Sequence, residues 1–437
     1  MKQTLRDVFQ TVLAQLELRR CLQAQQDRLR RFADRPLLVI AFGKAALPMA
    51  QTVHEMLADR VPMRGLVVPP AGEQDAGIAA AAFETIAGGH PLPDRQSLAA
   101  GRRALDLLAT THANERVLFL VSGGGSALLE WPRVVGVTID ELRSFYQALV
   151  ASGADIQSIN AVRRAFSAIK GGRLAAAGRR ANRQLTLAVS DVPNDAPQAI
   201  ASGPTVACAD PPGFADDVLR RFALHDQIPS AFAGSLSANH ESVPPSVPPD
   251  SEFVVVLGEG HARNAAVAAL EQDHGCVVEA GDRVDVDDWS VEAAATHLLK
   301  RLAELRQQHP GRRVAIVTTG ELSVPLPTNP GVGGRNQQFA LQLALQLDAG
   351  SEEACKVDGR AVTALSCGTD GVDGVAPAAG AVVDGTTVAR AQSAGHDPKA
   401  RLLACDAHPL FAALGDAVVT GPTGTNVRDL RILVHEA

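Results

Sequence analysis

The stretch VLFLVSGGGSA, residues 117–127, carries the clearest prediction of how this chain folds. Its first five residues are apolar, and three consecutive glycines follow one serine later. A short run that is apolar throughout is typical of a strand buried on both faces, as in a parallel sheet. Glycines directly after such a strand indicate a tight turn, here into a helix. Strand, glycine loop and helix in this order are the repeating unit of an α/β protein.

The same unit recurs on both sides of this stretch. Further strand-like runs occupy residues 37–42, 65–70, 185–191, 253–258, 314–320, 362–371, 381–384, 417–420 and 430–434. Helical patterns separate many of them, for example at 45–57, 139–152, 161–177, 261–272 and 336–347. We therefore predict two Rossmann-like α/β domains, each with a mainly parallel sheet flanked by helices.

The segment SANHESVPPSVPPDS, residues 237–251, is the predicted linker between these domains. It is rich in Ser and Pro and has no apolar periodicity, which is typical of a connecting segment. The predicted N-terminal domain is therefore 1–236, and the predicted C-terminal domain is 252–437.

Composition excludes several classes of protein. The net charge of −7 argues against a nucleic-acid binder, which would show a basic stripe. The six cysteines are scattered without a CxxC pair, so neither a zinc site nor a redox motif is predicted. The chain has no apolar run of eighteen residues and no signal-peptide pattern at its start. We expect a cytoplasmic protein that binds small molecules and no membrane.

Polar loops follow most of the predicted strands, and ligands of open α/β sheets bind at such strand ends. The first candidate is the glycine loop, whose backbone N–H groups can hold an anion; its alternative is a plain tight turn. Its residues are Ser122, Gly123, Gly124, Gly125 and Ser126. Lys44, in FGKAA, is a candidate phosphate contact, although a lysine at a strand end is more often solvated. His90, in GGHPLPD, is either a base or ligand or, more often for a lone histidine, a structural hydrogen-bonding group.

A second set of candidates carries carboxylates and a planar cation. Asp191 and Asp195 follow a strand and are candidate Mg²⁺ ligands, although Asp is also a common turn residue. Arg335, in GGRN, can direct its guanidinium at phosphate or carboxylate from the start of a helix. Further hydrogen-bonding candidates in the loops of the second half are Asn336, Asp370, Asp373, Thr423, Thr425 and Asn426. Together these loops predict a cleft that handles phosphate, because phosphoryl transfer needs positioned cations and donors.

Several long motifs occur in one order from about residue 40 to the C-terminus. They are FGKAA, GGHPLPD, SGGGSALL, ASGADIQSINAVRRAFSAIKGGRLA, SDVPNDAPQAIASGPT, VGGRNQQFAL, GTDGVDGVAPAAGAVVDG and TGPTGTNVRDL. With them the chain resembles the glycerate 2-kinases whose C-terminal domain is called MOFRL. Many members of that family are labelled hydroxypyruvate reductases.

The resemblance implies an ATP-dependent, Mg²⁺-requiring enzyme that converts glycerate to 2-phosphoglycerate and ADP in a cleft between its two domains. The essential lysine and arginine of the family correspond to Lys44 and Arg335, and we expect Asp191 to act with them. Asp191 and Asp370 are the expected Mg²⁺ ligands. The expected contacts to phosphate or substrate are residues 122–126 with Asn336, Thr425 and Asn426. A homodimer is also expected.

The chain departs from the family pattern at several positions. GELSVPLP stands where the family has GETTV, and Val332 replaces the first arginine of RGGRN. Asn194 replaces a glycine, and TNVRD brings in Arg428. We expect Arg428 to restore part of the charge lost at Val332. These changes leave open whether the substrate is glycerate or a related hydroxy acid.

Two other functions are alternatives to the kinase. An NAD(P)H-dependent hydroxypyruvate reductase is suggested by the family labels, but no GxGxxG with a downstream acidic residue follows a strand. A sensor that binds ATP or glycerate without releasing ADP is less consistent with so many charged loop residues.

Overall fold

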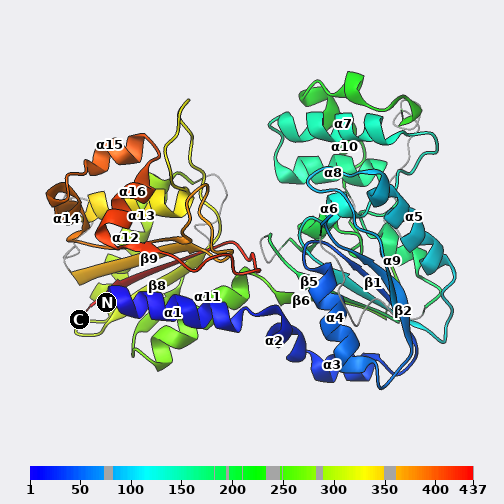
Figure 1. Cartoon of the computed structure of the whole chain (residues 1–437), viewed down its shortest axis with the longest axis horizontal. Coiled ribbons are helices and arrows are strands. Elements are labelled where there is room, and N and C mark those ends of the chain that lie inside the picture. Colours follow the sequence, from blue (N-terminus) through cyan, green and yellow to red (C-terminus); the bar gives the residue numbers. More distant parts are fainter. Residues whose placement is uncertain are drawn as a thin grey trace. The chain divides into compact units, whose positions relative to one another are not determined.

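The computed structural model describes residues 1–72, 82–181, 183–192, 196–208, 210–232, 247–248, 250–281, 289–348 and 361–436. The chain forms two compact units. The N-terminal unit comprises Leu18–Val256, and the C-terminal unit comprises Met1–Glu17 together with Leu257–Ala437 (Figure 1). Most of the predicted linker at 237–251 lies outside the described residues, and the two units divide after Val256.

The sheet of the N-terminal unit has the strand order β3-β2-β1-β4-β5-β6. Its strands are β1 (Leu37–Phe42), β2 (Met63–Val68), β3 (Phe83–Thr85), β4 (Arg116–Val121), β5 (Arg183–Val189) and β6 (Asp250–Leu257). The pairs β1–β2, β1–β4, β2–β3 and β4–β5 are parallel. Every residue of β1 is at most 1% exposed, so both faces of this strand are covered. This burial accounts for a sequence that is apolar throughout the strand.

Helices pack on this sheet and also form a separate helical cluster. Helices α4 (Ala46–Leu57) and α5 (Arg95–Ala109) contact the sheet, and α6 (Gly125–Leu128) and α9 (Arg173–Ala177) contribute to the same apolar core, while α2 (Leu18–Gln23) and α3 (Gln26–Phe32) precede β1. The cluster is formed by α7 (Ile139–Ala151), α8 (Ile156–Phe166) and α10 (Phe214–Arg221), which share an apolar core of their own (Figure 1). Three short 3₁₀ helices, Pro197–Ser202, His225–Gln227 and Ser230–Phe232, complete the described part of the unit.

The sheet of the C-terminal unit has the strand order β11-β10-β9-β12-β8-β7. Its strands are β7 (Val277–Ala280), β8 (Val314–Thr319), β9 (Val362–Gly368), β10 (Gly380–Asp384), β11 (Ala417–Val418) and β12 (Asp429–His435). Only β7–β8 is a parallel pair among the pairs of these described strands, and the other four are antiparallel. The two-domain α/β class is confirmed, but this sheet is mixed where we expected a mainly parallel one.

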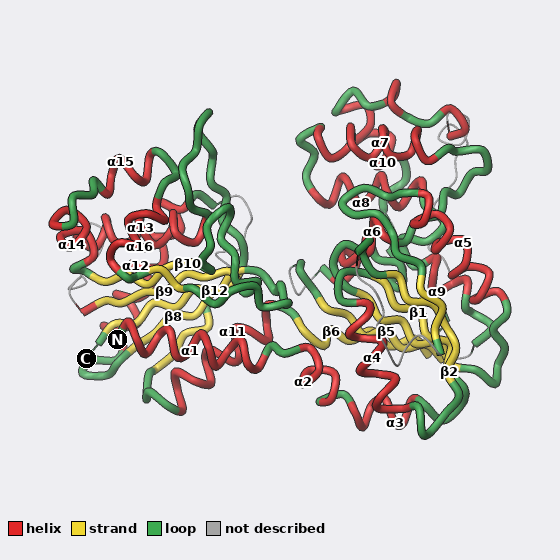
Figure 2. Tube along the Cα trace, in the orientation of Figure 1, coloured by secondary structure: helices red, strands yellow, loops and turns green. Residues whose placement is uncertain are grey.

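The connections of the C-terminal unit explain this difference. No helix separates β9 from β10, and a short connection of this kind returns the chain as an antiparallel neighbour. The last strand, β12, then lies between β8 and β9 and runs opposite to both. The described helices of the C-terminal unit are α1 (Lys2–Gln15), α11 (Glu259–Gln272), α12 (Val291–Gln308), α13 (Arg335–Asp348), α14 (Thr387–Ser393), α15 (Pro398–Leu403) and α16 (Ala407–Leu414). Figure 2 shows α1 and α11 on one side of the sheet and α12, α13 and α16 on the other.

Two segments lie in a different unit from the one that we predicted. Strand β6 lies next to β5 in the N-terminal sheet, although residues from 252 onward were assigned to the second domain. Helix α1 packs on α11, β9 and β10, so the start of the chain belongs to the C-terminal unit. None of the helices in the described part of the chain has the length and apolarity needed to span a bilayer.

Candidate active site

The glycine loop and the Lys44 loop lie side by side in the N-terminal unit. Strands β1 and β4 are parallel neighbours with Phe42 opposite Val121, so both loops leave the same edge of the sheet. The Lys44 N–H donates to the Gly123 carbonyl at 2.8 Å. Gly43 has φ +118°, and a Cβ there would overlap Ser122. Only glycine therefore permits this close approach of the two loops.

Three polar side chains surround the glycine loop. A Cβ on Gly123 would overlap the Asp191 carboxylate, so that carboxylate lies against the backbone of the loop. A Cβ on Gly124 would lie 2.9 Å from His90 Cδ2 and 3.2 Å from Lys44 Cγ. The side chains of Lys44 and His90 are exposed, and Asp191 is half-buried. The structure thus places Lys44, His90 and Asp191 around the glycine loop, and the catalytic roles expected of them stay predictions.

The electrostatics of His90 reflect this arrangement. Partial burial of its ring lowers the pKa of His90 although the residue is largely exposed, the positive charge of Lys44 lowers it further, and Asp191 opposes both effects. The imidazole is therefore kept neutral at neutral pH. From the sequence, His90 is a possible base or ligand, although a structural role is favoured for a lone histidine; its motif GGHPLPD lies between β3 and α5. Its proximity to Gly124 depends on how the loops converge, which a single sequence does not reveal.

A buried network supports the glycine loop from behind. The hydroxyls of Ser126 and Ser202 are 2.7 Å apart, and the Ser202 hydroxyl donates to Asn160 Oδ1 at 2.8 Å. Ser202 and the preceding Ala201 have φ of +61° and +50°, a left-handed conformation that costs non-glycine residues on the order of 1 kcal/mol each. The Gly171 N–H donates to the Ser202 carbonyl at 3.1 Å, which helps to hold this strained segment in place.

In the C-terminal unit, Arg335 begins α13 and is held by two carboxylates. Its Nε donates to Asp429 Oδ2 at 2.6 Å, and its Nη2 lies 2.8 Å from a carboxylate oxygen of Glu321. Burial acts to lower the pKa of Arg335, but Asp429 and Glu321 outweigh it and raise the pKa above its ordinary value. The Arg335 side chain is 36% exposed, so it is held in orientation by the two carboxylates while part of it remains accessible.

Asp373 organises the start of α13. Its two carboxylate oxygens accept from the backbone N–H groups of Asn336 at 2.9 Å and Gln337 at 2.8 Å, and from both amide side chains. Asn336 is 1% exposed, and its Oδ1 accepts from Ser366 Oγ at 2.7 Å. This geometry gives Asn336 a role in holding the helix start, and the substrate or phosphate contact expected of it stays a prediction.

The remaining predicted residues, Asp370, Thr425 and Asn426, lie in two loops that are hydrogen-bonded to each other. The Thr423 N–H donates to the Asp370 carbonyl at 3.1 Å, while the Asp370 carboxylate accepts from the Val372 N–H at 3.1 Å. Thr425 Oγ1 donates to the Leu16 carbonyl at 3.4 Å, and Asn426 Oδ1 accepts from the Arg428 N–H at 3.0 Å. Asn426 is exposed and Asp370 and Thr425 are half-buried, so all three remain open to a ligand.

The carboxylates of Asp191 and Asp370 fit Mg²⁺ only where a bound nucleotide supplies further ligands to the ion. Among the described residues, no three His, Cys, Asp or Glu side chains are grouped to hold a metal. Mg²⁺ is usually bound by one or two carboxylates with water and phosphate oxygens completing the shell, which Asp191 or Asp370 could provide together with a nucleotide. Asp195, the other candidate, lies outside the described residues.

Arg428 does not replace the arginine that is lost at Val332. Its guanidinium is 4% exposed and lies 3.2 Å from the Glu259 carboxylate, which is also buried. Val332, by contrast, is 40% exposed. The charge of Arg428 is therefore balanced inside the C-terminal unit, and the expected compensation is wrong.

The chain is similar to several known proteins along most of its length. Residues 1–237 match a family model described as a domain of unknown function, DUF4147, and residues 314–429 match the MOFRL family. A protein of Agrobacterium vitis with a provisional name as a hydroxypyruvate reductase is 36% identical over 91% of this chain and 86% of its own. The D-glycerate 2-kinase of Thermotoga maritima is 33% identical over 91% of this chain and 90% of its own. The crystal structure of glycerate kinase from the same organism superposes with a TM-score of 0.84, covers 99% of both chains and is 30% identical.

Proposed function

Since this chain belongs to the glycerate 2-kinase family with its C-terminal MOFRL domain, we propose that it transfers the γ-phosphoryl group of ATP to the 2-hydroxyl of glycerate. The products are 2-phosphoglycerate and ADP. The observation that carries the proposal is the pair of cationic sites. Lys44 borders a glycine loop in one unit, and Arg335 is oriented by two carboxylates in the other.

Phosphoryl transfer requires positioning and charge neutralisation more than covalent help from the protein. The backbone N–H groups of residues 123–126 hold oxygens of a phosphate or carboxylate group. Lys44 and Arg335 neutralise charge on the transferring group and on the carboxylate of the acid. Asp191 orients the attacking hydroxyl. When bound with ATP, Mg²⁺ supplies further charge neutralisation, and Asp191 and Asp370 are the carboxylates that would hold it.

An assay of ADP release over a panel of hydroxy acids tests the proposal. D-glycerate, L-glycerate and a four-carbon tetronate separate the substrate and its stereochemistry. We expect Lys44→Ala and Arg335→Ala each to lower kcat/KM about a hundredfold or more, as for other lost electrostatic stabilisers. Lys399→Ala and Arg312→Ala remove exposed cations elsewhere and should match the wild type. Turnover at the wild-type rate by Lys44→Ala would falsify the role of this lysine.

Reduction of hydroxypyruvate is the second candidate, because a relative carries that name. Its test is to mix the protein with NADH and hydroxypyruvate and to follow nicotinamide absorbance. We expect no oxidation of NADH, since the glycine loop SGGGSA lacks the GxGxxG pattern that binds a dinucleotide. Steady oxidation of NADH without ADP release from ATP and glycerate would replace the kinase by the reductase.

A further inference from the structure

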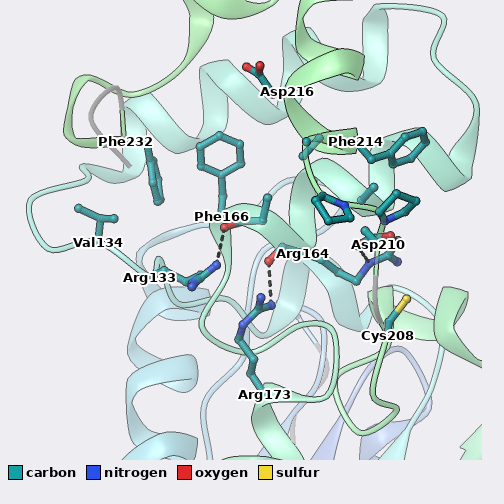
Figure 3. Close-up of a pocket in the computed structure, with 16 residues that line it drawn as sticks. Arg133, Val134, Arg164, Phe166, Arg173, Cys208, Asp210, Phe214, Asp216 and Phe232 are labelled. Carbon is teal, nitrogen blue, oxygen red and sulfur yellow. Dashed lines mark hydrogen bonds and ion pairs between the residues drawn. The ribbon is translucent and has the colours of Figure 1, made fainter. Parts of the chain in front are cut away.

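A second concentration of positive charge lies in the N-terminal unit, at the C-terminal end of α8. A cavity of about 240 Å³ opens there between α8, the start of α10 and the segment that precedes α7 (Figure 3). Its walls include Arg133, Arg164, Arg173, Phe166, Phe214 and Phe232. None of these residues belongs to the kinase site proposed above.

Three guanidinium groups line this cavity, and one of them is paired with a carboxylate. Arg164 is 7% exposed, and it donates to the two oxygens of Asp210 at 2.7 and 2.6 Å. Arg173 donates through Nη1 to the Arg164 and Lys170 carbonyls, both at 2.8 Å. Arg133 donates to the Ala165 carbonyl at 3.3 Å. Within the described part of the chain, neither Arg133 nor Arg173 has a carboxylate within 4.0 Å.

The resulting excess of positive charge favours a bound anion. The other carboxylate at the cavity, Asp216, is already paired with Arg220 and close to His225, so it does not balance the arginines. Burial is the largest cause that lowers the pKa of Arg173 to about 10; the positive charges of Arg133 and Arg164 add to it, and Asp210 opposes it. A carboxylate or phosphate in the cavity would relieve this repulsion and accept charge-assisted hydrogen bonds from the guanidinium groups.

The other walls of the cavity are apolar. Phe166 and Phe232 meet edge to face with their ring centroids 4.5 Å apart, and Val134, Pro211 and Phe214 lie beside them. A volume of about 240 Å³ is below the range of roughly 300–1,000 Å³ that holds drug-sized ligands. The occupant that fits these walls is therefore a small organic anion with a short carbon body.

The cavity is physically connected to the glycine loop. Asn160 and Arg164 are four residues apart on α8, so they share one face of the helix. Asn160 accepts from Ser202, whose hydroxyl contacts that of Ser126 in the glycine loop. The Lys170 carbonyl, which accepts from Arg173, begins the turn whose Gly171 N–H binds the Ser202 carbonyl.

We propose that this cavity is an effector site for a small phosphorylated or carboxylated metabolite, separate from the kinase site. Its occupancy acts on the glycine loop through α8 and Ser202. The binding half of the proposal stands without the proposed kinase function, whereas the effect on turnover rests on it.

Isothermal titration calorimetry with 3-phosphoglycerate tests the binding. The kinase site is first disabled by the double substitution Lys44→Ala, Arg335→Ala, and we expect one site per chain to remain. Adding Arg133→Gln to this protein should weaken the remaining binding about tenfold, which corresponds to about 1.4 kcal/mol. Arg133 is exposed, so the fold should tolerate this change. Adding Arg179→Gln, at an exposed arginine outside the cavity, is the matched control and should leave the affinity unchanged.

Two results would contradict the proposed effector site. One is the loss of all binding in the Lys44→Ala, Arg335→Ala protein, and the other is equal affinity with and without Arg133→Gln. Inorganic phosphate, titrated in parallel, should bind more weakly than 3-phosphoglycerate because it lacks the carbon body; equal affinity would overturn the role of the phenylalanine walls. In an otherwise wild-type kinase, Arg133→Gln should raise about tenfold the concentration of 3-phosphoglycerate that gives half of its effect on kcat at saturating substrate. An unchanged response would overturn the coupling alone.

Discussion

At the scale of single residues, Arg335 shows how the site depends on orientation as well as charge. Asp429 and Glu321 hold its planar guanidinium from two directions, and a lysine offers no such planar group. We expect Arg335→Lys to lower kcat/KM for glycerate at least about tenfold, although the positive charge is kept. ADP release over a range of glycerate concentrations measures this. Arg312→Lys, at an exposed position, should have no effect, and equal activity of both variants would contradict the expectation.

Asp373 makes stability depend on pH. Burial, which outweighs its four accepted hydrogen bonds, raises the pKa of Asp373 from 3.8 to about 6. Between these pH values the folded state binds the proton more tightly than the unfolded chain does. The contribution of Asp373 to stability is therefore full below about pH 4 and is lost as the pH rises to about 6, a change on the order of 3 kcal/mol.

The substitution Asp373→Asn isolates this effect. The variant should lack the part of the pH slope that belongs to Asp373, because its amide does not titrate. It should also be less stable at pH 5 by roughly 1–3 kcal/mol, because an amide places a donor against the N–H groups of Asn336 and Gln337. Urea unfolding of both proteins at several values between pH 4 and pH 7 measures the slope. Identical slopes would show that Asp373 does not titrate in this range.

At the scale of elements, the glycine loop is shaped by what lies against it. Gly124 and Gly153 have φ of +80° and +78°, so an alanine strains the backbone equally at both, by about 1 kcal/mol. A Cβ at Gly153 meets nothing within 4 Å, whereas one at Gly124 meets His90 and Lys44. The two positions therefore separate backbone strain from displacement of the site.

We expect Gly124→Ala to lower kcat about tenfold or more, since a displacement of about 1 Å at a site can cost that much. Gly153→Ala should keep wild-type turnover while it loses a similar amount of stability. Turnover by ADP release and thermal unfolding of the two variants give both quantities. Equal loss of activity in the two variants would mean that strain alone accounts for the effect.

At the scale of the whole molecule, the first helix of the chain is part of the C-terminal unit. Helix α1 buries Leu5, Val8, Phe9 and Val12, and its Lys2 lies 2.8 Å from Asp416. The helix packs against α11, β9 and β10 of the C-terminal unit. Residues more than two hundred positions apart in sequence therefore share one core, and damage to α1 should be felt first in the C-terminal unit.

The substitution Phe9→Ala tests this, since the ring is 0% exposed. We expect it to lower the free energy of unfolding of the C-terminal unit by about 3–5 kcal/mol, as for other buried phenylalanines. Limited proteolysis read by mass spectrometry should show new cleavage sites in residues 257–437 before any appear in 18–256. The neighbouring exposed change Gln10→Ala should leave the pattern as in the wild type. New cleavage that begins in 18–256 would contradict this organisation.

The sequence by itself determined the local features of this protein. Apolar runs such as 37–42 predict the buried strands, and glycines after strands predict the tight turns that follow them, because each depends on neighbouring residues. Only the tertiary structure decided that β12 lies antiparallel between β8 and β9, that β6 joins the first sheet and that α1 joins the C-terminal unit. It also decided that His90 faces the glycine loop and that Arg428 is buried against Glu259. These features depend on contacts between residues far apart in the chain, and an apolar run or a lone charge is compatible with several such partners.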